Sequence, residues 1–177
     1  MSVPSSDNSW LLVIDPQVIF ADPASEWAVS EFERAMRRVT ELATDYAGRI
    51  IVTRWVPQRP HLGSWKNYFE QWQFADRAPD DSYFDLMPAA AELDATVVSV
   101  PTFNKWGAEL SALTGETPQL VLTGVATCCC VLSTALAAAD AGAHVTVIAD
   151  GCADSTPENH AMGLNVMRLY EPQIVVR

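Results

Sequence analysis

The segment QLVLTGVATCCCVLSTALAAADAG (119–142) carries the pattern that decides the fold. It begins with a short apolar run, QLVLTG (119–124), passes through a turn that contains glycine, and ends in an alanine-rich helical pattern over 129–142. Thr127 is placed to act as the N-cap of that helix. A buried strand followed directly by a helix is the building unit of parallel α/β sheets, so we expect this segment to lie in one.

The same alternation of apolar runs and helical patterns continues on both sides of this segment. Five further runs are continuous rather than alternating in polarity, which is typical of strands buried on both faces: WLLVID (10–15), RIIVTRW (49–55), TVVSV (96–100), HVTVIAD (144–150) and QIVVR (173–177). Helical patterns lie between the runs, at 30–47, 87–93, 107–115 and 157–170. The sequence predicts a doubly wound, three-layer α/β/α sandwich with a six-stranded, mainly parallel sheet, formed by residues 1–177 as a single domain.

Charge and composition limit the classes of function. The 177-residue chain has 11 Lys and Arg against 22 Asp and Glu, a formal net charge of −11. Nucleic-acid binding needs clustered cationic side chains, so this balance argues against a nucleic-acid partner. No apolar run is long enough for a bilayer and the N-terminus does not resemble a secretory signal, so we expect a cytoplasmic protein with no membrane partner.

The stretch between the second and third strands, residues 55–88, departs from the regular alternation. It is unusually rich in aromatic side chains: Trp55, Trp65, Tyr68, Phe69, Trp72, Phe74, Tyr83 and Phe84. Within it, SWKNYFEQW (64–72) has the pattern of a short helix. A connection of this length is unusual unless it covers a site or forms an interface, and the sequence leaves both uses open.

Polar and thiol side chains follow several of the predicted strands. Asp15 follows the first run, Lys105 follows the third, and Cys128, Cys129 and Cys130 follow the fourth. Ligands of open α/β sheets bind beyond the carboxyl ends of the strands, so we expect these groups at one edge of the sheet. A thiol in the first turn of a helix lies near free N–H groups that favour the thiolate, although the pattern does not choose among the three cysteines.

The cysteines do not indicate a disulfide framework or a zinc site. Sequence neighbours do not readily adopt the geometry of a disulfide, and zinc sites use spaced ligands. Free cysteine is among the most buried residue types, so simple packing is the alternative for each of them. Cys152, the fourth cysteine, is expected to pack near the rim of the site.

Three motifs resemble those of the isochorismatase-like cysteine hydrolases, the superfamily of nicotinamidases, pyrazinamidases and N-carbamoylsarcosine amidases. They are VIDPQVIF (13–20), PTFNKW (101–106) and GVATCCCVLSTALAAADAG (124–142), in the order that the superfamily has them. The resemblance implies a triad of Asp15, Lys105 and Cys130. In this triad Asp15 takes the thiol proton, and Lys105 stabilises the thiolate and is expected to lower the pKa of Cys130 from about 8.5.

The third motif also implies the surroundings of the nucleophile. Cys128 and Cys129 fall on two variable positions of the motif, so we expect them to be mainly packing or turn residues. The resemblance implies a cis peptide bond between Val125 and Ala126. It further implies an oxyanion hole formed by the N–H groups of Ala126 and Cys130.

Departures from the superfamily pattern restrict the substrate. Nicotinamidases have an Asp-x-His segment after the second strand, with a further histidine, that binds a divalent metal; here TRWVPQRPHLGSW (53–65) contains only His61. We therefore expect no metal and no other cofactor, and nicotinamide is less favoured. Isochorismate is also disfavoured, because enzymes that hydrolyse it generally lack the cysteine. The remaining expectation is an amide or carbamoyl-type C–N bond of a small molecule.

Four side chains near the expected pocket are candidates for substrate binding: Phe20, Arg54, Trp55 and Trp65. Arg54 is the candidate partner for a carboxylate, and packing in the core or at an interface is the alternative for all four. His160, in the segment TPENHAMG (156–163), is expected to be structural. The resemblance implies a homo-oligomer, either a dimer or a tetramer.

Other classes of function remain open on the residues alone. One is a non-catalytic α/β domain that binds a small ligand, or a thiol redox sensor that uses the cysteine cluster. Another is a flavodoxin-like nucleotide binder, but no Gly-x-Gly-x-x-Gly follows the first strand, and this makes a dinucleotide site a weak alternative.

Overall fold

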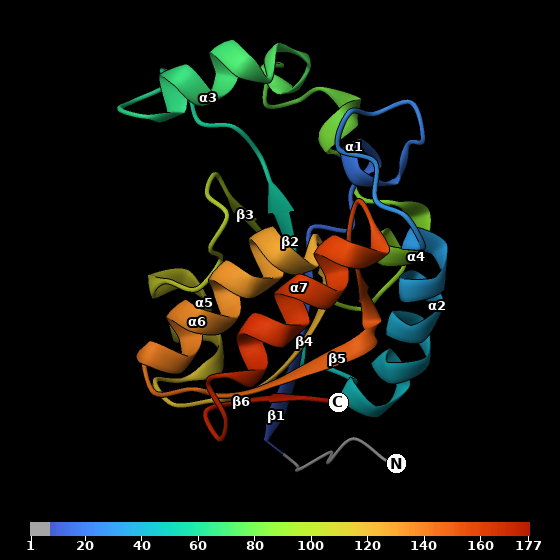
Figure 1. Cartoon of the computed structure of the whole chain (residues 1–177). Coiled ribbons are helices and arrows are strands. Elements are labelled where there is room, and N and C mark those ends of the chain that lie inside the picture. Colours follow the sequence, from blue (N-terminus) through green and yellow to red (C-terminus); the bar gives the residue numbers. More distant parts are fainter. Residues whose placement is uncertain (1–7) are drawn as a thin grey trace.

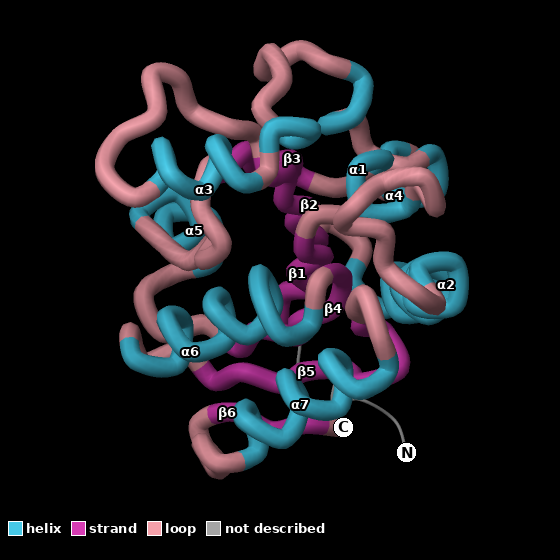
Figure 2. Tube along the Cα trace, turned by 45° about the horizontal axis from the view of Figure 1, so that its top comes forward, coloured by secondary structure: helices cyan, strands magenta, loops and turns pink. Residues whose placement is uncertain are grey.

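The computed structural model describes residues 8–177, in which six strands form one parallel sheet. The strands are β1 (Ser9–Ile14), β2 (Ile50–Trp55), β3 (Thr96–Val100), β4 (Gln119–Val125), β5 (His144–Ala153) and β6 (Ile174–Val176). Their order in the sheet is β3-β2-β1-β4-β5-β6, and every strand pairing is parallel (Figure 2). The predicted fold class is confirmed, with an all-parallel sheet where a mainly parallel one was expected.

Helices cover both faces of this sheet (Figures 1 and 2). One face packs against α2 (Phe32–Ala43), and the other against α5 (Ala108–Thr114), α6 (Leu132–Asp140) and α7 (Pro157–Arg168). The side chains of β1 divide accordingly: Leu11 and Val13 pack in the core with α2, and Leu12 and Ile14 pack in the core with the other three helices. Two apolar cores on opposite faces are what a doubly wound sheet requires.

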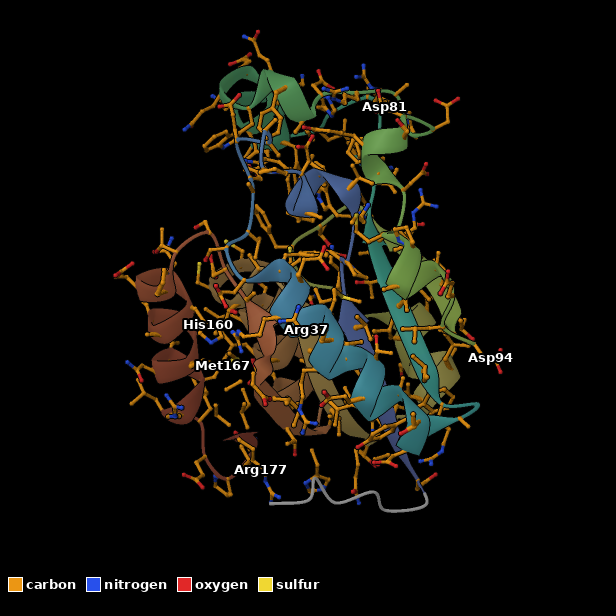
Figure 3. All side chains as sticks on the ribbon, turned by 90° about the vertical axis from the view of Figure 1, so that its right-hand side faces the viewer. Arg37, Asp81, Asp94, His160, Met167 and Arg177 are labelled. Carbon is orange, nitrogen blue, oxygen red and sulfur yellow. The ribbon has the colours of Figure 1, made fainter. Side chains whose placement is uncertain are left out.

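The helix α2 illustrates how the sequence forms these layers. Its buried side chains Phe32, Ala35, Met36 and Val39 recur every three or four residues, so they lie on one face. Arg37 lies on the opposite, solvent side of the helix (Figure 3). None of the helices in the described part of the chain is long and apolar enough to cross a bilayer.

The aromatic segment between β2 and β3 lies above the carboxyl edge of the sheet (Figure 1). It contains α3 (Trp65–Gln71), two short 3-10 turns and α4 (Pro88–Ala91). The buried side chain of Gln17, just before α1 (Val18–Ala21), joins its two ends. Its Nε2 donates to the carbonyls of Trp55 (2.9 Å) and Phe84 (2.8 Å), and its Oε1 accepts the Trp55 N–H (2.7 Å). The side-chain amide of Gln17 thus fixes both ends of the aromatic segment next to α1.

The end of β4 approaches β1 very closely. Gly124 has a φ of 103°, and a Cβ atom at this position would overlap the backbone of Ile14. Glycine is therefore required here, both for the left-handed backbone conformation and for the close approach. The helical turn that follows β4, Thr127–Val131, is π-helical and leads directly into α6.

Candidate active site

Asp15 follows β1 and forms a fully buried ion pair with Lys105. Asp15 Oδ2 lies 2.8 Å from Lys105 Nζ, and neither side chain is accessible to solvent. The other carboxylate oxygen, Oδ1, accepts a hydrogen bond from the Thr53 hydroxyl (2.7 Å), and that hydroxyl accepts the N–H of Asp15 (3.1 Å). A buried ion pair needs such additional hydrogen bonds, because they offset part of the cost of removing the charges from water.

Lys105 is held by two further hydrogen bonds. Its Nζ donates to the carbonyl of Thr102 (2.7 Å), and its backbone N–H donates to the hydroxyl of Thr134 (2.9 Å). The Thr134 hydroxyl in turn donates to the carbonyl of Cys130 (2.7 Å). This chain of bonds connects the loop that carries Lys105 to the turn that carries Cys130, so the two residues keep a fixed relative position.

Cys130 lies in the turn Thr127–Val131 and is only 5% exposed. Its thiol feels the charges of both Asp15 and Lys105. Burial, reinforced by the negative charge of Asp15, raises the pKa of the Cys130 thiol well above its usual range, while the positive charge of Lys105 opposes this rise. The expected lowering of this pKa is therefore wrong, because burial and Asp15 outweigh Lys105. The site contains a neutral thiol beside an aspartate–lysine pair.

The turn before Cys130 presents a free backbone donor. The Val125–Ala126 peptide bond is cis, as the resemblance implies. The Ala126 carbonyl accepts the N–H groups of Cys129 and Val131, both at 3.2 Å. The Ala126 N–H itself has no hydrogen-bond partner within residues 8–177, and Ala126 lines the cavity described below.

The predicted N-cap role of Thr127 is wrong. Its buried hydroxyl donates to the Ala153 carbonyl (3.0 Å) and lies 2.8 Å from Nδ1 of His160 on α7 (Figure 3), so it ties the turn to β5 and α7. The N–H of Cys128 donates instead to Oδ2 of Asp154 (2.6 Å). Asp154 follows β5, and its acceptor role could not be found from sequence neighbours because it lies 26 residues away. His160 has the structural contact that was expected of it.

A cavity of about 250 Å³ opens beside these groups. Six aromatic rings and all three adjacent cysteines contribute to its wall, together with a few polar groups: Phe20, Trp27, Trp55, Tyr68, Trp72, Phe103, Cys128, Cys129, Cys130, Glu26, Asp154, Ser155 and Asn159. Small-molecule sites are typically concave, mostly apolar and supplied with a few polar groups, and this cavity has that character.

The four candidate substrate-binding residues are placed differently. Phe20 and Trp55 line the cavity. Trp65 does not: its ring packs against Tyr68 and Phe103 at centroid distances of 5.2 and 5.3 Å and lines a smaller, separate cavity. Arg54 is also absent from the wall, whereas its neighbour Trp55 is part of it.

Several cavity residues were not predicted from the sequence. Glu26 and Trp27 come from the loop between α1 and α2, which matches no motif and follows no strand. Phe103 and Asp154 had a usable signal, because each follows the carboxyl end of a predicted strand. The edge rule includes both positions, but no sequence pattern assigns either side chain to the wall of the cavity.

The residues that would hold a metal in a nicotinamidase are not available here. Both ring nitrogens of His61 are engaged, Nδ1 with the Gln58 carbonyl (3.0 Å) and Nε2 with Asp76 Oδ1 (2.8 Å), and the ring stacks on Phe69. Within residues 8–177 no three His, Cys, Asp or Glu side chains are grouped so that they could hold a metal ion. The side chains present do not fit that group.

The chain is thus an open, all-parallel α/β protein with a thiol, a carboxylate and an ammonium at the carboxyl edge of its sheet. The family profile for the isochorismatase domain matches residues 9–175, so the chain belongs to the isochorismatase family of hydrolases. Comparison with curated proteins gives no significant match.

Three solved structures illustrate the similarity of fold. A cysteine hydrolase from Pseudomonas syringae pv. phaseolicola has a TM-score of 0.79 at 15% identity, with 96% of this chain and 88% of that chain covered. An isochorismatase-like hydrolase from Alkaliphilus metalliredigens has 0.74 at 20% identity, covering 96% and 93%. The nicotinamidase SaPncA from Staphylococcus aureus has 0.71 at 19% identity, covering 97% and 98%. At these identities the similarity establishes the fold alone.

Proposed function

We propose that this protein is a cysteine hydrolase that cleaves an amide or carbamoyl-type C–N bond of a small molecule, with Asp15, Lys105 and Cys130 as its catalytic residues. The observation that carries the proposal is the solvent-inaccessible Asp15–Lys105 pair, 2.8 Å between Oδ2 and Nζ, beside a thiol that lines an aromatic cavity. A buried charged pair is costly to maintain for stability alone, so its position beside a nucleophile supports a chemical role.

The geometry supports a two-step reaction. Because the pKa of Cys130 is raised, the thiol keeps its proton until attack, and Asp15 accepts that proton as the sulfur bonds to the carbonyl carbon. The oxyanion takes hydrogen bonds from the N–H groups of Ala126 and Cys130. The C–N bond then breaks, and the departing amine receives the proton from Asp15. This leaves a thioester on Cys130.

Water completes the reaction. Asp15, again a carboxylate, accepts a proton from the water that attacks the thioester carbonyl. The C–S bond breaks, the sulfur of Cys130 recovers the proton and the carboxylic acid product leaves. The ammonium of Lys105, 2.8 Å from Asp15 Oδ2, offsets the negative charge that Asp15 carries whenever it has given up the proton. No step needs a metal or an organic cofactor.

Ammonia release tests the proposal. The purified chain is incubated with a panel of small primary amides and carbamoyl compounds, in parallel with the Cys130→Ala and Cys129→Ala variants. We expect release with at least one compound, loss of release in Cys130→Ala and retention in Cys129→Ala. Equal release by the native chain and Cys130→Ala would overturn the proposed role of Cys130.

A thiol redox sensor is the second candidate, because the sulfurs of Cys128 and Cys129 are 3.8 Å apart. Both thiols have a raised pKa, for which burial is the largest cause, and this disfavours the thiolates that oxidants attack. Treatment with hydrogen peroxide followed by mass mapping separates the two functions. A Cys128–Cys129 disulfide formed at low peroxide, together with no amide turnover, would favour the sensor.

A further inference from the structure

The charged groups at the cavity are all acidic. Glu26 and Asp154 are the only charged side chains in its wall, and neither forms an ion pair within the described chain. Asp154 is hydrogen bonded only by uncharged donors, the N–H groups of Cys128 and Ser155 and the Ser155 hydroxyl. The cavity therefore carries uncompensated negative charge.

No basic side chain of the described residues is part of the cavity wall. Lys105 is fully buried and is occupied by Asp15 and the Thr102 carbonyl. Arg34 lines a separate cavity, to which Asp154 also contributes, and it forms an ion pair with Glu31 at 3.2 Å. Arg54, the candidate partner for a carboxylate, is absent from the wall. A substrate carboxylate would meet no cation in this cavity and would be repelled by two acidic groups.

The aromatic rings reinforce this preference. Trp27 is their centre: its ring is stacked with Phe20 (6.1 Å between centroids), meets Trp55 edge-on (5.3 Å), and also contacts Tyr68 (5.8 Å) and Trp72 (5.9 Å). The faces of aromatic rings carry negative electrostatic potential and bind cations, quaternary ammonium groups above all. Aromatic faces with carboxylates nearby favour a positively charged ligand.

The cysteines of the wall are consistent with a negative potential. Burial raises the pKa of both Cys128 and Cys129, and the negative charge of Asp154 adds to the rise in each case. The thiols are therefore neutral near pH 7 and do not change the sign of the charge in the cavity. They contribute polarisable apolar surface.

We propose that the substrate is a small amide whose non-reacting part carries a cationic ammonium group, preferably methylated, which the Trp27 cluster and the acidic side chains hold while the carbonyl lies at Cys130. This inference rests on the proposed function and adds to it the charge and chemical class of the substrate. The cavity of about 250 Å³ is small for a ligand site, which typically has roughly 300–1,000 Å³, so a compact ammonium compound fits it better than a drug-sized one.

Binding of three probes of similar size and different charge tests the inference without any turnover. They are choline, its neutral carbon isostere 3,3-dimethylbutan-1-ol, and the anion 3,3-dimethylbutanoate, each titrated into the native chain by calorimetry. We expect choline to bind about tenfold or more tighter than the alcohol, because cation–π contacts and carboxylates act on the charge alone. Tighter binding of the alcohol or the anion, or no detectable choline binding, overturns the inference.

Substitutions in the cavity wall identify the side chains that bind the cation. Glu26→Gln should weaken choline binding about threefold and leave the affinity for the alcohol unchanged. Glu33→Gln, which removes an exposed charge on α2 away from the cavity, is the control and should change neither affinity. Trp27→Leu should weaken choline about tenfold, and Trp27→Phe should recover most of the loss because it keeps an aromatic face. Trp72→Leu, at a half-buried ring, repeats the test if thermal melting shows that Trp27→Leu is unfolded. Equal choline affinity across these variants contradicts the assignment.

Turnover then separates the two proposals. Ammonia release is compared for trimethylammonioacetamide and 3,3-dimethylbutanamide, which differ only in the charged nitrogen. We expect kcat/KM to be at least about tenfold higher for the cationic amide. Choline binding without hydrolysis of either amide would support the proposed cation site and contradict the proposed hydrolase activity. Hydrolysis with preference for the neutral amide would keep the hydrolase and contradict the cation site.

Discussion

Replacing Lys105 by methionine removes the ammonium that neutralises the buried charge of Asp15. The two side chains are completely inaccessible, with 2.8 Å between Oδ2 and Nζ, so water cannot take the place of the lost partner. Asp15 keeps only its hydrogen bonds with Thr53. Removing one member of a buried ion pair costs about 3–5 kcal/mol, which is a large part of the roughly 5–15 kcal/mol that keeps a typical domain folded.

A double variant separates the cost of the stranded charge from the loss of the side chain. In Asp15→Asn/Lys105→Met both charges are replaced by neutral groups of similar size, so we expect most of the lost free energy of unfolding to return. Neither variant should release ammonia from an amide, because the single variant lacks the ammonium of Lys105 and the double variant also lacks the proton acceptor Asp15. Lys66→Met, at an exposed lysine, is the control and should change stability by no more than about 0.5 kcal/mol.

Urea unfolding followed by tryptophan fluorescence measures these differences. The reasoning would be refuted if Lys105→Met lost less than about 1 kcal/mol, or if the double variant were no more stable than the single one. Either result would mean that Asp15 and Lys105 are not an interdependent buried ion pair.

Three further predictions follow from particular positions. Gly124→Ala should lower the free energy of unfolding, measured in urea, by more than about 2 kcal/mol, because its Cβ would overlap Ile14. Gly48→Ala, with a φ of 75° but open space around it, should lower it by only about 1 kcal/mol. Equal losses would contradict the close approach of Gly124 to Ile14. The raised pKa of Cys130 contributes to folded-state stability below the ordinary thiol pKa of about 8.5, and this contribution is lost as the pH rises toward the raised value. The free energy of unfolding should therefore fall above about pH 8.5, and less steeply in Cys130→Ala. Parallel pH profiles of the two proteins would contradict the raised pKa. Light scattering should give a dimer or a tetramer of the 19.4 kDa chain, and a monomer mass would contradict the expectation of a homo-oligomer.

The sequence allowed the fold to be predicted because its signals are local. Strands buried on both faces leave continuous apolar runs, and the carboxyl-edge rule predicts that Asp15 and Lys105 lie at the same edge of the sheet. The order of the strands can be read from a single sequence. The contact of 2.8 Å between the two charged groups also depends on the hydrogen bonds that hold Lys105 to Thr102 and Thr134.

Other features of the site depend on packing between distant segments. The raised pKa of Cys130 reflects how completely its neighbours exclude water, and no local pattern encodes that. The acceptor for the Cys128 N–H is Asp154, from another strand end. Trp27 reaches the cavity from a loop without a motif, and Trp65 packs against Phe103 without lining the cavity itself. Each of these was missed or misplaced for the same reason, namely that side-chain direction in loops is set by tertiary contacts.

The covalent intermediate is the most direct test of the account. Trimethylammonioacetamide is mixed with the native chain, the reaction is stopped with acid within its first turnovers, and the intact mass and the peptide that contains 128–130 are measured. The account predicts an added trimethylammonioacetyl group on Cys130 that decays on longer incubation and is absent from Cys130→Ala. Ammonia release at the native rate by Cys130→Ala, or an acyl group carried by Cys128 or Cys129 in place of Cys130, would contradict it.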